Sequence, residues 1–305
     1  MFRIVRVDSR RKEVLEPLGT KRKFWFRDDQ GRRLLFKAEE RGTGEDWAEK
    51  IAGELAQLLG LPHVSYELAV ESDGETPGVV CESCAPPPVS LVLGNQLLLA
   101  RDPDYPAEEG RKYKVREHTV SAVAETVQGL QRPPSSWTEA LPSTIETALD
   151  VFTGYVMLDA WVANQDRHHE NWAALRDAGV LRLAPTFDHG ASMARNLSDK
   201  ERHERLTSRD GNRQIPYFVR KARSAFFAET TSQRPLTTIQ AWRGFADRTP
   251  HAARVWLDQL RAVDVQAIDG LLLEVPPHRM SQVCRDFTRE LLLENQRRLI
   301  AGETE

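Results

Sequence analysis

The sequence predicts an α+β protein of two lobes: a small antiparallel β lobe with one helix, followed by a larger, mostly helical lobe. With 305 residues the chain exceeds the size at which one hydrophobic core usually suffices. Short aromatic and aliphatic runs between turn residues fill the first part of the chain, and helical patterns fill the remainder. A proline run after residue 85 marks the boundary, so the expected lobes are residues 1–85 and 86–305.

Composition narrows the functional classes. Hydrophobic residues make up 40% of the chain and charged residues 29%, which is typical of a globular protein. The net charge of −3 gives no general attraction to nucleic acid, so no direct nucleic-acid binding is expected. No apolar run approaches the roughly 20 residues that span a bilayer, and the N-terminus lacks the pattern of a secretory signal. These features favour a cytoplasmic protein.

The first lobe is predicted to hold five strands and one helix. The strands are expected at residues 2–7, 24–26, 34–37, 63–70 and 78–82. The turn at residues 28–31 ends in glycine and joins the second and third strands into a hairpin. Thr43 and Asp46 have the spacing of a helix capping box, and Gly60 ends the helix that follows.

An ion pair is expected between the third strand and this helix. Lys37 ends the strand, and Glu49 lies beside Ala52, Gly53 and Ala56 on the small-residue face of the helix. Small residues permit close approach to a sheet, which would bring Glu49 to Lys37; Glu54 is the alternative acid. An exposed helix glutamate is the competing interpretation.

The second lobe centres on a helix predicted from residue 143 to residue 162. It is apolar nearly all round and therefore buried, and Ser143 with Glu146 is predicted to cap it. From residue 89 the chain is predicted to be helical rather than extended. Three amphipathic helices are expected near the C-terminus, at residues 237–245, 251–263 and 281–300.

Immediately after the buried helix comes the sequence NQDRHHEN, at residues 164–171. A short hairpin follows and leads to Asp188, His189 and Gly190. Phosphoryl transfer uses an aspartate beside the acceptor hydroxyl, and an amide oxygen with a second carboxylate to hold magnesium. Asp166 fits the first role, and Asn171 with Asp188 fits the second. Asp, Asn and His also gather in ordinary turns, but their order after a buried helix favours the site.

Two further segments could contact a nucleotide. Thr20, Lys21 and Lys23 form a basic loop that could donate charge and N–H groups to phosphates, although a solvated turn is the alternative. The backbone at Glu82 and Cys84, before the prolines, is expected to bind adenine. The CxxC formed by Cys81 and Cys84 lacks a second ligand pair, so linker residues are favoured over a metal or redox site.

Four stretches together resemble the HipA-like serine/threonine kinases, bacterial relatives of toxin kinases with a phosphatidylinositol-kinase-like loop. These stretches are LFK at 35–37, the helix at 45–61, NQDRHHEN, and LAPTFDHG at 183–190. The resemblance implies a bilobal protein-kinase-like fold that uses ATP and Mg²⁺. It implies that Lys37 binds phosphate with Glu49 as its partner, that Asp166 is catalytic, and that Asn171 and Asp188 hold the metal.

The resemblance also implies that His168 packs the catalytic segment. It suggests a protein substrate such as a translation factor or an aminoacyl-tRNA synthetase. The short N-terminal part favours compact members over those that pair with a DNA-binding antitoxin. Thr20, the one hydroxyl in the basic loop, is the candidate for autophosphorylation.

Three functions therefore compete. The first is an ATP- and Mg²⁺-dependent protein serine/threonine kinase, and the second is a lipid or small-molecule phosphotransferase. The third, a non-catalytic nucleotide-binding protein, is disfavoured because Lys37, Asp166, Asn171 and Asp188 are all of the required type.

Overall fold

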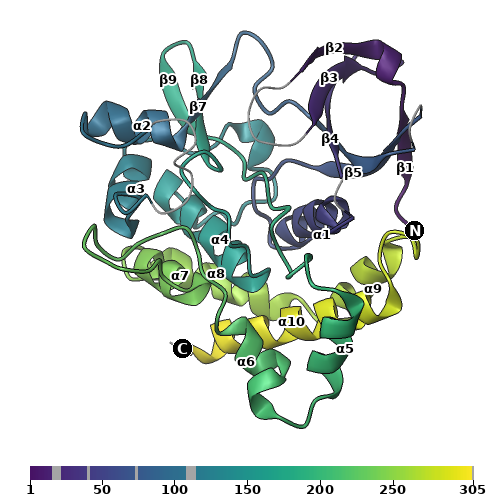
Figure 1. The fold of residues 1–305 in the computed structure, drawn as a ribbon. Helices are drawn as coiled ribbons and strands as arrows, with labels where there is room; N and C mark the ends of the chain where they lie inside the picture. Colours follow the sequence, from purple (N-terminus) through teal and green to yellow (C-terminus); the bar gives the residue numbers. More distant parts are fainter. Residues whose placement is uncertain (16–21, 40–41, 73–74, 108–114, 304–305) are drawn as a thin grey trace.

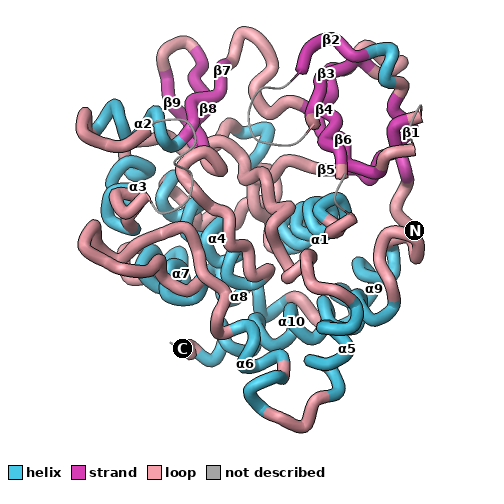
Figure 2. Tube along the Cα trace, viewed as in Figure 1, coloured by secondary structure: helices cyan, strands magenta, loops and turns pink. Residues whose placement is uncertain are grey.

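A computed structural model describes residues 1–15, 22–39, 42–72, 75–107 and 115–303. Figure 1 shows a β-rich part that curls beside a single helix, and a larger part made mainly of helices. Figure 2 shows the strands in two groups. Across the described residues, no helix is both long and apolar enough to cross a membrane.

The β-rich part contains a six-stranded sheet in the described chain, with the order β1-β5-β6-β4-β3-β2. Its strands are β1 (Ile4–Val7), β2 (Lys12–Leu15), β3 (Lys23–Arg27), β4 (Arg33–Ala38), β5 (Tyr66–Glu71) and β6 (Pro77–Glu82). β1 pairs with β5 in parallel, and the other pairs are antiparallel. The sequence missed β2. It also started β5 too early, because His63 forms an isolated bridge with Thr186 instead.

Register sorts the side chains of this sheet onto two faces. Phe24, Phe26 and Phe36 point to a buried apolar cluster on one face. Lys37 lies on the other face because side chains alternate along β4. Lys23 is opposite Lys37, and Trp25 is opposite Leu35, so this second face carries a basic row beside an apolar one.

Helix α1 (Glu45–Leu58) is buried along most of its length and packs into the main hydrophobic core of the helical part. The predicted Thr43–Asp46 capping box is wrong. Gly44 is the N-cap residue at φ 80°, without a side-chain cap bond of its own. Instead, the Glu39 carboxylate accepts from the backbone N–H of Glu45 at 2.6 Å, satisfying a donor at the positive end of the helix.

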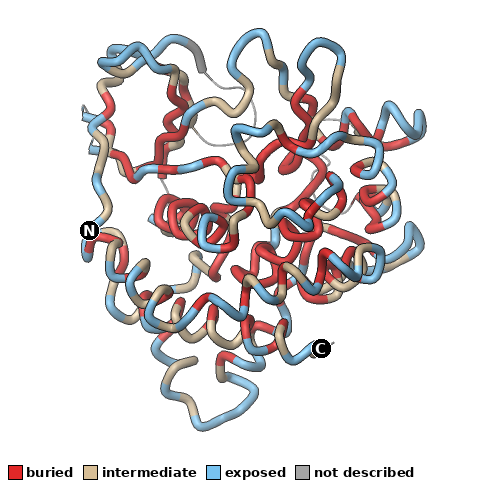
Figure 3. Tube along the Cα trace, turned by 180° about the vertical axis from the view of Figure 1, so that it is seen from behind, coloured by how far each residue is buried: buried red, intermediate tan, exposed pale blue. Residues whose placement is uncertain are grey.

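Helix α4 (Ala148–Trp161) forms the centre of the helical part, and every residue except Asp150 is buried. Thr147 and Asp150 form its capping box, so the prediction of Ser143 and Glu146 was wrong. The surrounding helices are α2 (Gly94–Arg101), α3 (Val120–Gln128), α5 (Asp199–Thr207), α6 (Ile215–Val219), α7 (Thr238–Ala246), α8 (Pro250–Ala262), α9 (Val265–Glu274) and α10 (Gln282–Ala301). In Figure 3, buried residues run through the middle of the molecule.

A second, antiparallel sheet has the order β7-β8-β9. Its strands are β7 (Ser90–Leu93), β8 (Ala173–Asp177) and β9 (Val180–Leu183). The expected helix from residue 89 was wrong, because residues 90–93 pair with β8. Gly94 begins α2, and a Cβ there would lie 2.6 Å from the His169 carbonyl oxygen. The β8–β9 hairpin leads the chain directly back to Asp188.

Candidate active site

A cavity of about 750 Å³ lies between the curled sheet and the loops that follow α4 and β9. Eight of the residues proposed from sequence line it: Lys23, Lys37, Glu82, Cys84, Asp166, His168, Asn171 and Asp188. Glu49 contacts Lys37. Thr20 and Lys21 lie outside the described residues. The fold thus brings the described candidates to one place, while their chemical roles stay predictions.

Lys37 is a residue of the sheet that contacts acidic side chains of α1 and of the loop after β9. Its Nζ lies 3.2 Å from Asp188 Oδ1 and 3.5 Å from Glu49 Oε1. Nζ also donates to the hydroxyl of Tyr66 at 3.3 Å, a residue that the sequence analysis missed. Burial disfavours the charged ammonium, but the Asp188 and Glu49 carboxylates outweigh it and raise the pKa of Lys37 well above its ordinary value. The amine is therefore a fixed cation.

Asp188 occupies a strained backbone position. Its φ is 60°, in the left-handed region, which costs a non-glycine residue about 1–2 kcal/mol. Its backbone N–H points to the hydroxyl of Tyr66 at 3.3 Å. Two residues on, a Cβ at Gly190 would lie 2.9 Å from Glu49 Oε2. Glycine at 190 thus lets this turn lie directly on α1.

The loop after α4 holds Asp166 and Asn171 together. The side-chain amide of Asn171 donates to the backbone oxygen of Asp166 at 2.6 Å, which leaves the amide oxygen as its other polar end. The Asp166 backbone N–H donates to Asn164 Oδ1 at 3.1 Å. The Asp166 side chain is 25% exposed, and its Oδ1 lies 3.7 Å from His168 Nε2. Asp166 is therefore fixed by its backbone, and its side chain lines the cavity although its Oδ1 is buried.

Arg167 supports this loop from below, and the sequence analysis gave it no role. Its side chain is almost fully buried and pairs with Asp159 at the end of α4 through two hydrogen bonds, of 2.7 and 2.8 Å. It also donates to the Asn171 backbone oxygen at 2.8 Å and to His189 Nε2 at 3.1 Å. Burial lowers the pKa of His189 well below its usual value, so the ring stays neutral and accepts this bond. One guanidinium thus joins both loops.

No family model matches the sequence, and no curated protein matches it either. Solved structures do match. The Helicobacter pylori proinflammatory kinase CtkA is 16% identical over 98% of this chain and 96% of that chain, with a TM-score of 0.70. The Shewanella oneidensis toxin HipA, solved with HipB and operator DNA, is 14% identical over 93% of this chain and 64% of that chain, with a TM-score of 0.53.

This chain has a HipA-like kinase fold. The expected α+β architecture, with a β-sheet lobe and a helical lobe, is confirmed. In this kinase-like fold the cavity lies between the two lobes, with Lys37 contributed by the sheet and Asp166, Asn171 and Asp188 by the helical side.

On the sheet side of the kinase-like cleft lies a row of mainly apolar side chains, which we call the apolar row and which the sequence analysis did not identify. Strand register aligns Trp25, Leu35, Cys81 and Tyr66 across four strands, and all four line the cavity. The guanidinium of Arg33 lies 4.4 Å from the ring centre of Trp25. The apolar row suits a flat ring, and the neighbouring row with Lys23 and Lys37 suits an anion.

Cys81 is buried and Cys84 is half-buried, and both are free thiols. Burial raises the pKa of Cys81 to about 12 and that of Cys84 to about 11. Both thiols are thus protonated near neutral pH, which disfavours metal binding and thiolate chemistry. Glu82 carries a mostly exposed side chain paired with Arg32 at 2.9 Å. Backbone contact of Glu82 and Cys84 with adenine stays a prediction.

The donor set fits a nucleotide with a hard metal ion. Asp188 and Glu49 place two carboxylates around one ammonium, so this cluster carries one excess negative charge. The amide of Asn171 and the carboxylate of Asp188 both line the cavity. Magnesium prefers oxygen ligands and commonly takes one or two carboxylates from protein. The residues present match that preference.

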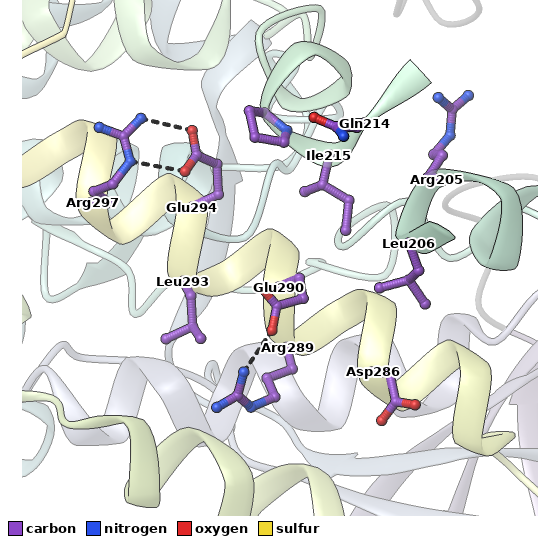
Figure 4. Close-up of a pocket in the computed structure, with 11 residues that line it drawn as sticks. Arg205, Leu206, Gln214, Ile215, Asp286, Arg289, Glu290, Leu293, Glu294 and Arg297 are labelled. Atoms are coloured by element: carbon purple, nitrogen blue, oxygen red, sulfur yellow. Dashed lines mark hydrogen bonds and ion pairs between the residues drawn. The ribbon is translucent and has the colours of Figure 1, made fainter. Parts of the chain in front are cut away.

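A second hollow, of about 720 Å³, lies on α10 beside α5 and α6, and we call it the α10 groove. Its labelled residues in Figure 4 include Arg289, Glu290, Glu294 and Arg297. Arg297 pairs with Glu294 at 2.8 Å, and Arg289 pairs with Glu290 at 2.6 Å. None of the residues proposed from sequence lines this groove.

Proposed function

We propose that this protein is an ATP- and Mg²⁺-dependent kinase that transfers the γ-phosphate of ATP to a serine or threonine hydroxyl of a protein. The main support is the position of Lys37. It reaches Glu49 and Asp188 at once, in a cavity that Asp166 and Asn171 also line. A cation from one lobe and oxygen donors from the other are what phosphoryl transfer requires.

Each residue has a distinct task in this proposal. Lys37 binds the phosphates as a cation, and Glu49 holds its ammonium from the α1 side. Asn171 and Asp188 would hold Mg²⁺, which supplies charge neutralisation for the phosphates when bound. Asp166 orients the acceptor hydroxyl and takes its proton, because its side chain lines the cavity while its backbone is fixed.

Arg167 and His168 act on Asp166 without touching the reacting atoms. Arg167 joins the loop to Asp159 by an ion pair, and the backbone N–H of His168 donates to the backbone oxygen of Asp166 at 2.7 Å. Preorganisation of this kind reduces the reorganisation needed during the reaction. We propose that the apolar row of the sheet faces the adenine ring.

The acceptor class is the part that needs experiment. We expect ATP labelled at the γ-phosphate to transfer its label to protein when the chain is incubated with a whole-cell lysate and Mg²⁺. Acid-stable label in phosphoserine or phosphothreonine supports the proposal. Label confined to the lipid or small-molecule fraction would replace it with the second candidate function, a lipid or small-molecule phosphotransferase.

Partners are proposed from the kinase-like fold alone. A translation factor or an aminoacyl-tRNA synthetase stays the suggested substrate class, and phosphopeptide mapping of the labelled lysate identifies it. The matched HipA structure contains HipB and operator DNA, but this chain covers 64% of that HipA chain. Whether this chain has such an antitoxin partner is tested by co-purification of a small DNA-binding protein with the tagged chain.

A further inference from the structure

The segment after Asp188 is strained and buried. Met193 and Ala194 have φ values of 54° and 47°, so two consecutive non-glycine residues occupy the left-handed region. Such a conformation is unfavourable for a non-glycine residue and persists only when the surrounding structure holds it. Met193 is fully buried, and its backbone N–H donates to the Val162 oxygen at 2.7 Å. The segment is thus tightly constrained next to the candidate active site.

Arg195 directly follows these two residues and points back toward the site. Its Nε donates to the Gly190 oxygen at 2.6 Å. The same guanidinium bonds the hydroxyl of Thr43 and forms an ion pair with Glu45 at the start of α1. The side chains of Arg195 and Glu45 are 16% and 9% exposed. Charge-assisted bonds with this little exposure are stronger than surface pairs.

Glu45 is not an arbitrary contact on α1. It lies four residues before Glu49, so the two side chains share one face of the helix. Gly190 lies against both residues: a Cβ there would be 2.9 Å from Glu49 Oε2 and 3.6 Å from the backbone oxygen of Glu45. Arg195 therefore contacts α1 at Glu45, one helical turn before Glu49. It also contacts Gly190, two residues after Asp188.

We propose that Arg195 is a positioning residue for phosphoryl transfer, which sets the separation of Glu49 and Asp188 at Lys37 by joining α1 to the Gly190 turn. This inference rests on the proposed kinase function. Arg195 also lines the cavity, and its three described side-chain contacts join Gly190 to Thr43 and Glu45 at the start of α1. Its effect on the reaction therefore passes through Glu49.

The test is a double-mutant cycle on phosphoryl transfer from γ-labelled ATP to lysate protein. We expect Arg195→Gln to lower kcat about 30-fold, because small misplacements of a reacting group can cost up to about a hundredfold. The KM for ATP should change less than about threefold. When Glu49 is already Gln, Arg195→Gln should lower kcat by less than about a further twofold, because the effects of coupled residues do not add. Arg195→Lys should recover part of the loss.

Controls separate this role from general stability. Arg205→Gln makes the same chemical change in the α10 groove and should keep full activity. All rates are measured well below the unfolding midpoints, and Glu45→Gln tests the same contact from the other side if Arg195→Gln does not fold.

Full activity in Arg195→Gln, or in Glu45→Gln where that variant replaces it, would overturn the inference and leave the kinase function intact. The inference would also be overturned if the double variant lost kcat by the product of the two single-variant losses. A wild-type protein that neither binds ATP nor transfers label would overturn the function, and this inference with it.

Discussion

The interlobe cleft and the α10 groove have almost the same volume, about 750 and 720 Å³, but their charges are arranged differently. In the groove, Arg297 pairs with Glu294 three residues away, and Arg289 pairs with the adjacent Glu290 and with Asp269 of α9. In the cleft, Lys37 pairs with Glu49 and Asp188, which are 12 and 151 residues away in sequence. Volume does not distinguish the two cavities. Burial of the charges does, because the Lys37 and Glu49 side chains are 14% and 3% exposed, whereas those of Arg289 and Arg297 are 35% and 53% exposed.

Energetics explain why this difference is informative. Exposed pairs within one helix contribute about 0.3–0.5 kcal/mol and form without help from the fold. Three charged groups from separate elements must be held together by the surrounding structure, and burial of unmatched charge costs free energy. Such an arrangement is retained where it performs a task, so the cleft is the better candidate for chemistry.

The largest contrast between the hollows should be in catalysis. Asp188→Asn removes a proposed metal ligand and one of the two carboxylates at Lys37, so we expect phosphoryl transfer to fall about a thousandfold. Glu294→Gln makes the same kind of change in the α10 groove and should keep wild-type activity. Initial rates with labelled ATP check both, and equal activity in the two variants would remove the distinction.

Stability should show the second contrast. Asp159→Asn leaves Arg167 buried without its charged partner, and we expect the free energy of unfolding to fall by about 3–5 kcal/mol. Glu290→Gln removes an exposed partner of Arg289 and should cost less than about 1 kcal/mol. Urea denaturation of both variants measures the difference. A loss below about 1 kcal/mol for Asp159→Asn would show that the loop does not depend on this pair.

A pH contrast comes from the core behind the catalytic loop. Burial lowers the pKa of His118 to about 3, and the neutral ring accepts from Trp172 Nε1 at 3.2 Å. The unfolded chain gains a proton near pH 6.5 while the folded chain does not. Stability from this group is therefore complete above about pH 6.5 and is lost as pH falls toward 3.

The expected slope for His118 approaches about 1.4 kcal/mol per pH unit. His118→Gln should reduce the slope of the unfolding free energy between pH 6 and pH 4.5, measured by urea titrations at several pH values. An unchanged slope in His118→Gln would contradict the assignment.

The smallest contrast concerns two glycines. Gly190→Ala places a methyl group 2.9 Å from Glu49 Oε2 and should cost about 1–3 kcal/mol or an equivalent loss of activity. Gly270→Ala lies within α9 with nothing near its added Cβ, so it should stabilise the protein by about 0.5–1 kcal/mol. Thermal unfolding midpoints that move in opposite directions would agree with this.

Sequence patterns predicted the parts of the site that depend on local geometry. The small-residue face of the helix predicted that Glu49 would contact Lys37, and the two side chains lie 3.5 Å apart. The segment at residues 164–171 forms one loop, so its polar residues could be recognised together. The Lys37–Glu49 contact was predictable because the strand and the helix are neighbours in sequence. The chemical roles of these residues stay predictions.

Contacts between distant segments were missed. Tyr66 reaches Lys37 only through sheet pairing, and Arg195 contacts Glu45 across about half of the chain. Asp46 looked like a capping residue but pairs with Arg279 at 2.6 Å. β7 was assigned as helix because its pairing with β8, not its local sequence, makes it a strand. Helix α9 was not foreseen at all. Competition between such partners cannot be read from one segment alone.

The burial of α1 in the main core determines which groups can shift relative to one another. Trp47, Ile51 and Leu55 pack with the helices around α4, and Arg279 fastens Asp46 from the loop before α10. Glu49 is consequently anchored to the same rigid framework as Asp166 and Asp188. Lys37 belongs to the sheet, and Arg279 also donates to the Ala69 oxygen of β5. The same arginine therefore joins the strand layer to α1, and the distance from the ammonium to the acids depends on how the sheet packs on that helix.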